Sequence, residues 1–217
     1  MKKCLLGISV FWLLLAAAGW CGERIAPIDD FEKGIDPRWQ QKAFKGETLY
    51  TVVPDGEGRV LRAESRAAAS GLVFEKKYDL QDYPLLAWRW KVSNVLAKGD
   101  ARTRAGDDYA ARVYVIFPHW FPLKTRSINY IWANRLPEGD FIPNSYYGNA
   151  VMLAVESGPE KAGQWVQERR NVLADYRMLF GEEPPTVGAI AIMTDTDNTG
   201  ESVVAYYDDI RLEKAGE

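Results

Sequence analysis

The sequence predicts an all-β fold: a jelly-roll-like antiparallel β-sandwich with one short α-helix, after a cleaved signal peptide. From Ile25 onward, short apolar or alternating segments recur about every ten to twenty residues, and Gly, Pro, Asp and Asn separate them. One segment alone has helical spacing, and the chain opens with two lysines and an apolar run. These three observations predict the fold class and the leader.

The predicted leader occupies residues 1–22. Two lysines precede an uncharged stretch from Cys4 to Gly22, which is the pattern of a secretory signal peptide. An uncleaved membrane anchor is the alternative, but the apolar run is short for spanning about 30 Å of hydrocarbon. We therefore expect a single β-sandwich domain at residues 23–217, a periplasmic or secreted location, and no stable transmembrane segment after cleavage.

Cysteine use and charge limit the possibilities for the mature chain. Both cysteines, Cys4 and Cys21, lie in the leader, so the mature domain has no internal disulfide and must be held by its core or by a metal. Removal of Lys2 and Lys3 takes the formal net charge from −3 to about −5, with both signs interspersed. A nucleic-acid binder would carry a basic stripe, so nucleic acid is excluded as a partner.

Eleven segments are expected to be strands. Hairpin turns are expected at residues 54–58 and 196–201, where Gly, Asp or Asn gather between strand segments. The stretches 94–106 and 118–126 are expected to be long loops, which often carry binding residues. The expected strands are residues 27–32, 48–53, 59–65, 71–78, 85–92, 109–117, 127–133, 150–156, 165–169, 187–194 and 202–212.

Alternation identifies the buried face of one expected strand and the position of another. Trp88 and Trp90 alternate with Arg89, which predicts one core face and one face toward solvent or a groove. Residues 109–117 are apolar on both faces apart from Arg112, which predicts a central strand covered on both sides.

The single helix is expected between Val172 and Phe180, where apolar residues recur at helical spacing. Asn171 is suited to the N-cap position, and Gly181 is suited to ending the helix. One short helix packed on a sandwich satisfies this pattern.

Catalytic motifs are absent from the sequence. The only histidine is His119, and the mature chain has neither a Gly-x-Ser-x-Gly motif nor a suitably flanked cysteine. One histidine and at most one cysteine cannot form the usual zinc site. Paired carboxylates could still act in a glycosidase, but the sequence does not give their separation. The available carboxylates are Asp107, Asp108, Glu138, Asp140 and Glu156.

Acidic residues gather at both ends of the mature chain. If the terminal strands of the sandwich pair, these carboxylates approach and repel one another, and a calcium ion would relieve the repulsion. The alternative is that they are solvated or form ion pairs with Arg211 or Arg38. The residues concerned are Asp29, Asp30 and Glu32 at one end and Asp208 and Asp209 at the other.

A further acidic segment, from Asp195 to Gly200, resembles the start of an EF-hand calcium loop. It departs from that pattern at Thr199 and at Tyr206, where a bidentate glutamate is needed, and its flanks are expected to be strands. A turn rich in Asp, Asn and Gly is the preferred interpretation.

Several aromatic residues fall in or beside the expected loops. Aromatic rings stack on the apolar faces of sugars while nearby Asp, Asn and Arg side chains bind hydroxyls, so such a set can bind glycan. Core packing is the alternative, which we prefer for Trp88, Trp90 and Tyr114. Both interpretations stay open for Trp120, Trp132, Tyr146 and Tyr147.

Six segments of the chain resemble the bacterial domain-of-unknown-function 3047 family. They are Trp88–Val92, Gly106–Val115, Ile128–Ala133, Arg170–Tyr176, Phe180–Glu182 and Met193–Gly200. The resemblance extends from Asp30 to Ile210, which is nearly the whole mature chain. It implies an exported location and a fold, and it supplies no activity.

The two ends of the domain are also similar to galactose-binding-like jelly rolls, which include carbohydrate-binding modules. The similar segments are Asp29–Glu32 and Tyr207–Leu212. In those modules such acidic residues often hold a structural calcium, which the resemblance would place at Asp30, Glu32 and Asp209.

The predicted function is non-catalytic binding of carbohydrate or another envelope glycan. A polysaccharide-acting hydrolase or lyase is one alternative, and an envelope structural or assembly factor is another. Fold-level similarity supports much of this prediction, and a fold alone does not determine a function. The candidate ligand-binding residues are Asp107, Asp108, Arg112, Trp120, Tyr130, Trp132, Tyr146 and Tyr147, of which Asp107, Asp108 and Arg112 would serve an enzyme.

Overall fold

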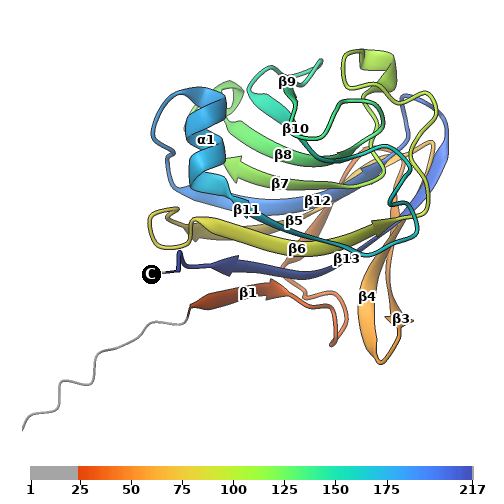
Figure 1. Cartoon of the computed structure of the whole chain (residues 1–217), viewed down its shortest axis with the longest axis horizontal. Helices are drawn as coiled ribbons and strands as arrows, with labels where there is room; N and C mark the ends of the chain where they lie inside the picture. Colours follow the sequence, from red (N-terminus) through yellow and green to blue (C-terminus); the bar gives the residue numbers. More distant parts are fainter. Residues whose placement is uncertain (1–23, 217) are drawn as a thin grey trace, which may run out of the picture.

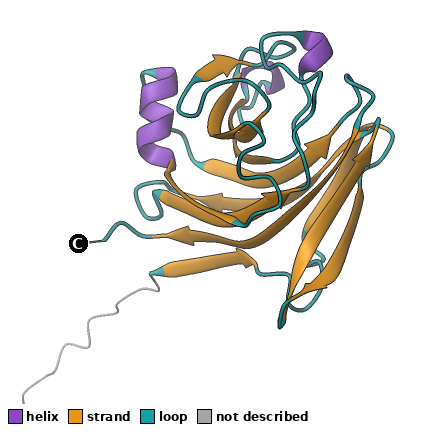
Figure 2. Ribbon diagram, turned by 45° about the vertical axis from the view of Figure 1, so that its right-hand side comes forward, coloured by secondary structure: helices purple, strands orange, loops and turns teal. Residues whose placement is uncertain are grey.

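The protein is a sandwich of two β-sheets with one α-helix at its edge (Figures 1 and 2). The computed structural model describes residues 24–216, and the leader predicted at residues 1–22 lies outside them. The predicted fold class, a β-sandwich with one short helix, is confirmed. Within residues 24–216, no helix is long and apolar enough to cross a membrane.

The first sheet has six strands, and its centre is β13. They are β1 (Ile25–Asp29), β3 (Leu49–Asp55), β4 (Gly58–Arg66), β6 (Leu85–Val92), β11 (Val166–Asn171) and β13 (Ser202–Glu213). The order is β11-β6-β13-β4-β3, and β1 pairs with the second half of β13, beyond the half that pairs with β4. The terminal strands of the domain therefore pair, as expected (Figure 1).

The second sheet has seven strands in the order β2-β5-β12-β7-β8-β10-β9. They are β2 (Trp39–Lys45), β5 (Ala69–Tyr78), β7 (Arg112–Phe117), β8 (Arg126–Ala133), β9 (Phe141–Pro143), β10 (Ala150–Ser157) and β12 (Val187–Asp195). All neighbours are antiparallel except β8 and β10, which run parallel.

Four aromatic rings join the two sheets in a continuous stack, which we call the aromatic column. Trp88 and Trp90 of β6 lie 5.4 Å apart, Trp88 lies 5.4 Å from Tyr130 of β8, and Trp90 lies 5.8 Å from Trp132. All four residues are completely buried. Each such ring buries roughly 150–250 Å² of surface, so the column contributes much of the attraction between the sheets. The predicted core positions of Trp88 and Trp90 are confirmed.

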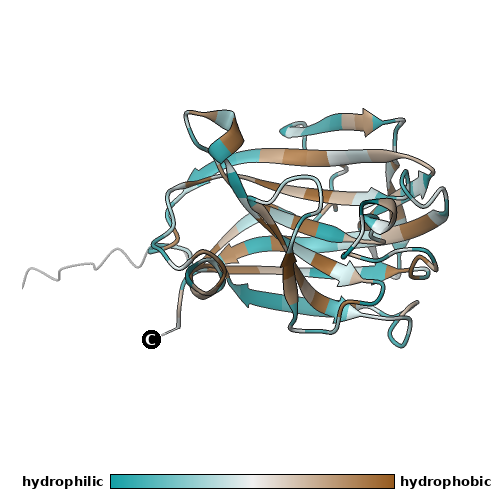
Figure 3. Ribbon diagram, turned by 90° about the horizontal axis from the view of Figure 1, so that it is seen from above, coloured by the Kyte–Doolittle hydropathy of each residue, from teal (hydrophilic) through white to brown (hydrophobic). Residues whose placement is uncertain are grey.

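Polar and apolar residues alternate along many strands, as Figure 3 shows.

The helix α1 (Val172–Phe180) begins where the Asn171 Oδ1 atom accepts from the Ala174 amide at 3.0 Å, and it ends at Gly181, which has a φ of +71°. Both ends agree with the prediction. The expected loops contain two single-turn 3₁₀ helices, at Arg104–Gly106 and Pro122–Lys124.

Three details differ from the sequence prediction. β2 and β9 were not expected, because both are edge strands whose side chains are mostly exposed and show no apolar alternation. The segment 196–201 is not a hairpin turn, since β12 and β13 belong to different sheets and the segment crosses between them. The turn at residues 54–58 does join β3 and β4 as a hairpin.

Two carboxylates lie close to the core at the β11 edge of the sandwich. Glu156 of β10 is 4% exposed, and its Oε1 atom forms an ion pair with the Nζ atom of Lys161 at 2.6 Å. Glu168 of β11 points inward, and its Oε1 atom is buried without a hydrogen-bond partner in the described structure. Burial, together with the charge of Glu156, raises the pKa of Glu168 to about 7.

We expect Glu168→Gln to stabilise the protein at pH 8 and to have little effect near pH 4. Between the ordinary value of 4.5 and about 7, the folded state holds a proton that the unfolded state releases, so Glu168 lowers the free energy of unfolding as the pH rises. The gain at pH 8 should be about 1–3 kcal/mol. Urea unfolding at the two pH values measures it. Glu57→Gln, in an exposed turn, is the control, and an equal gain for both variants would contradict the assignment.

Candidate ligand-binding groove

A groove of about 730 Å³ lies on the outer face of the seven-stranded sheet. This volume is within the range of small-molecule sites in proteins. Its floor comes from the three central strands, because side chains alternate and those between the core residues must point outward. The floor residues are Arg112, Tyr114 and Ile116 of β7, Ser127 and Asn129 of β8, and Met193 and Asp195 of β12.

The walls of the groove come from the edge strand β2 and from two loops. Phe44 of β2 is 73% exposed, and Tyr146 of the β9–β10 loop is 55% exposed. The Tyr146 hydroxyl donates to Asn198 Oδ1 at 2.7 Å, which joins that loop to the β12–β13 loop. The Tyr147 hydroxyl donates to the Thr125 carbonyl at 2.8 Å. Rings and amides are therefore held at the rim in fixed positions.

A second, smaller hydrophobic cluster covers the rest of the outer face and closes one end of the groove. Loop residues pack there on the outward side chains of β8 and β10. The cluster consists of Ala101, Tyr109, Ile131, Ala133, Leu136, Met152 and Ala154.

A buried ion pair lies at the same end of the groove. Arg112 donates through Nε to Asp195 Oδ1 at 2.8 Å and through Nη2 to Asp195 Oδ2, and both side chains are almost fully buried. Arg112 also donates to the Asp107 carbonyl at 3.0 Å, and its guanidinium lies 4.4 Å from the centre of the Tyr109 ring. The Arg112 charge is thus fully committed within the protein.

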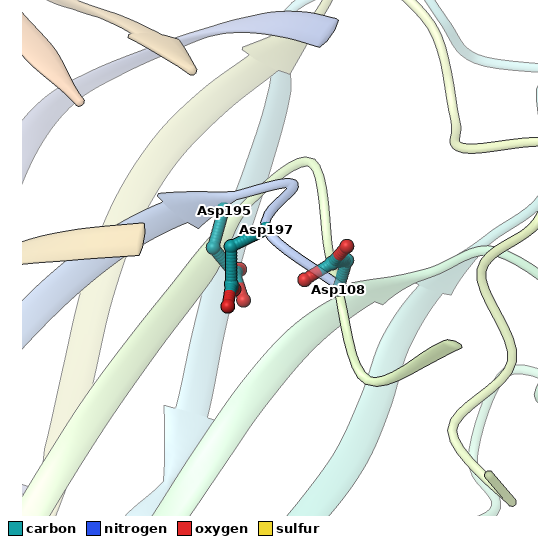
Figure 4. A group of neighbouring side chains, drawn as sticks. All are labelled: Asp108, Asp195 and Asp197. Carbon is teal, nitrogen blue, oxygen red and sulfur yellow. The ribbon is translucent and has the colours of Figure 1, made fainter. Parts of the chain in front are cut away.

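Three carboxylates, Asp108, Asp195 and Asp197, meet beside this ion pair (Figure 4). Each offers an oxygen atom within 4.8 Å of the others, so the group could hold a metal ion. Many of these oxygens already have partners, however. Asp108 accepts from the amides of Asn198 at 3.0 Å and Thr199 at 2.6 Å, and Asp195 binds Arg112.

Asp197 is the least committed of the three carboxylates. Its Oδ2 atom lies 3.8 Å from the Nζ atom of Lys45, and Lys45 is exposed whereas Asp197 is half-buried. Burial raises the pKa of Asp197, and the charge of Asp108 raises it further.

The structure brings four of the predicted ligand-binding residues together in the groove: Asp107, Arg112, Tyr146 and Tyr147. Asp108 lies just behind them and anchors the β12–β13 loop.

Three predicted residues lie elsewhere. Tyr130 and Trp132 belong to the aromatic column and have no exposed surface, so they are corrected from ligand-binding to core residues. Tyr130 and Trp132 are two positions apart on β8, so their side chains lie on the same face of the sheet, the inner one. Trp120 is 88% exposed on the loop between β7 and β8 and does not line the groove.

The acidic residues predicted to hold calcium are not brought together by their side chains. The one group of three carboxylates that meets within residues 24–216 excludes Asp30, Glu32 and Asp209. Glu32 instead accepts from the Arg59 amide at 3.1 Å, and Asp209 pairs with Arg89 at 3.2 Å. A structural calcium ion stays a prediction.

Several residues of the groove were not predicted from the sequence. Tyr114 was expected in the core, but it lines the groove floor and is half-buried. Asp195 was interpreted as part of a turn. The Asp-rich segments that contain Asp107 and Asp195 were the available signal, but nothing local showed that they meet. The other missed residues are Phe44, Asn129, Asn144 and Asn198.

A family model described as "Protein of unknown function (DUF3047)" matches residues 37–211. No curated protein matches the chain significantly.

Among solved structures, the chain is similar to carbohydrate-binding modules. The family 11 module of the cellulosomal cellulase Lic26A-Cel5E of Clostridium thermocellum has a TM-score of 0.52 at 12% identity, over 89% of this chain and 96% of that chain. The family 30 module of the cellulase Cel9D-Cel44B of the same organism has a TM-score of 0.48 at 11% identity, over 83% and 93%. TmCBM61 in complex with β-1,4-galactotriose has 0.44 at 10%, over 86% and 94%. At 12% identity, the similarity to the family 11 module shows the fold alone.

We expect Arg112→Met to destabilise the protein by about 3–5 kcal/mol, because it leaves the Asp195 carboxylate buried without a counter-charge. The double variant Arg112→Met with Asp195→Leu should recover much of the loss. Arg169→Met removes an exposed ion pair with Glu213 and should cost less than about 1 kcal/mol. Denaturant unfolding of the three variants measures these changes, and similar losses for Arg112→Met and Arg169→Met would show that the buried pair has no special role.

Proposed function

This chain belongs to the DUF3047 family, and we propose that it is a non-catalytic module that binds carbohydrate in the groove on its seven-stranded sheet. One observation carries the proposal. The groove is open, has a volume of about 730 Å³, and presents aromatic rings beside polar side chains.

The rings of the groove are suited to stacking on sugars. Tyr146 and Phe44 are exposed on opposite walls, and Tyr114 lies half-buried on the floor between them. The Asn144 and Asn198 amides donate to Asp107 and Asp108 and hold the rim in place. The least committed polar group of the groove is the Asp197 carboxylate, which can accept from sugar hydroxyls. An apolar sugar face and its hydroxyl edge would therefore both find partners in the groove.

The carboxylates of the groove support binding rather than catalysis. A general acid or base must reach the substrate with a free carboxyl group. Asp195 is held by Arg112, and Asp108 accepts from the backbone of the β12–β13 loop. Asp107 accepts from the Tyr109 hydroxyl at 3.1 Å and from Asn144 Nδ2 at 2.7 Å. These side chains hold the site together. Asp197 is then a single free carboxylate, whereas a glycosidase needs a pair.

Two further observations agree with the proposal. The family 11 module that shares this fold is a carbohydrate-binding module. The export signal predicted at residues 1–22 would place the protein in the periplasm or outside the cell, where polysaccharides are accessible.

Tyr146→Ala should weaken oligosaccharide binding by about tenfold or more, because it removes the most exposed tyrosine of the groove. A glycan array identifies the ligand, and calorimetry on the mature domain measures the affinity. Trp120→Ala is the matched control, since this exposed aromatic residue lies outside the groove. Retention of no glycan, or a loss of binding for Trp120→Ala but not for Tyr146→Ala, would overturn the proposal.

A further inference from the structure

Asn129 lies on the floor of the groove and has an unused hydrogen-bond acceptor buried there. The residue is 2% exposed, and its Nδ2 atom donates to the Met152 sulfur atom at 3.1 Å. Its Oδ1 atom is buried and has no hydrogen-bond partner within the described part of the chain. Native proteins leave few buried polar atoms unpaired, so an orphaned acceptor in a ligand-sized groove points to a donor on the ligand. A sugar hydroxyl is such a donor.

The two arginines that line the groove already have carboxylate partners, and Arg104 lies at the rim, 5.2 Å from the centre of the Tyr146 ring. Arg112 binds Asp195, and Arg126 binds Glu182 at the other end of the groove. These two are the only arginines or lysines among the described residues that line the groove, and neither is free for an anionic ligand. An acidic sugar would have to displace a carboxylate from one of them, either the buried Asp195 or the exposed Glu182.

The remaining charges of the groove are negative. The Asp107 carboxylate accepts hydrogen bonds only from the neutral groups of Tyr109 and Asn144, and the nearby Arg112 is already paired with Asp195. Asp197 lines the groove, and its one cationic neighbour is the exposed Lys45, which lies 3.8 Å from its carboxylate and donates to its carbonyl at 2.8 Å. Like charges close to a binding site penalise an anionic ligand and thereby contribute to specificity.

We propose that the groove selects uncharged, hydroxyl-rich glycan chains, with Asn129 accepting a hydrogen bond from a ligand hydroxyl. This inference rests on the proposed function and specifies its ligand class. Attraction comes from the rings and from Asn129, and rejection of acidic polysaccharides comes from Asp107 and Asp197.

Affinity electrophoresis of the mature domain against polysaccharides of different charge tests the ligand class. The neutral probes are laminarin, lichenan, xylan, glucomannan and β-1,4-galactan, the anionic probes are polygalacturonate, alginate and heparin, and chitosan is the cationic probe. We expect retention by at least one neutral probe and none by the anionic probes. Equal or stronger retention by an anionic probe or by chitosan would overturn the inference and leave the proposed function standing. Retention by no probe would count against the proposed function itself.

The neutral probe that is retained then serves to test Asn129. Asn129→Leu, which keeps the size of the side chain and removes its acceptor, should weaken binding by about tenfold. Its melting temperature should change little, because the acceptor has no partner to lose in the free protein and the lost donor binds only the weakly accepting Met152 sulfur. Asn94→Leu, at an exposed position in the loop that follows β6, is the control. Unchanged binding by Asn129→Leu, or a loss of binding together with a large loss of stability, would contradict the assigned role.

A further variant tests the contribution of the negative charge on the groove wall. Asp197→Asn removes one negative charge from the groove wall and keeps the hydrogen bond from Lys45 to the backbone carbonyl of residue 197. It should raise retention by polygalacturonate while leaving retention by the neutral probe within about twofold. If polygalacturonate remains unretained by the variant, the wall charge does not determine the selectivity.

Discussion

Packing of the aromatic column between the two sheets is the constraint on which the rest of the structure depends. Successive side chains of a strand point to opposite faces, so burying Tyr130 turns the neighbouring Asn129 toward the outer face. In the same way, burial of Val113 and Val115 turns Tyr114 outward. The floor of the groove is therefore the reverse side of the core, and a one-residue shift in register would destroy both.

The outer face of the seven-stranded sheet is divided into a covered part and an open part. The smaller hydrophobic cluster covers the ends of β8 and β10, and the open remainder becomes the groove. The loops at the rim are tied to one another, as the hydrogen bond from Tyr146 to Asn198 shows. A binding surface held in this way loses little conformational freedom when a ligand arrives, which favours affinity.

The buried pair of Arg112 and Asp195 has a positional role. Desolvation of two charges offsets much of their attraction, so such a pair contributes little net stability, although breaking it is costly. It does determine where the end of β12 lies relative to the start of β7. Together with Asp108, which accepts from the amides of Asn198 and Thr199, it sets the position of the β12–β13 loop. The residues that resemble catalytic carboxylates are thus occupied in shaping the groove.

Secondary-structure features that depend on a few neighbouring residues could be predicted from the sequence alone. Strand alternation, the caps of α1 at Asn171 and Gly181, and the turn at residues 54–58 are encoded within a few neighbouring residues, and the structure confirms them. The edge strands β2 and β9 carry no such pattern and were missed. Which aromatic residues belong to the core, and which acidic segments lie close together, became clear only from the tertiary structure. Arg112 and Asp195 are 83 positions apart, and their contact depends on the order of the strands, which no local pattern contains.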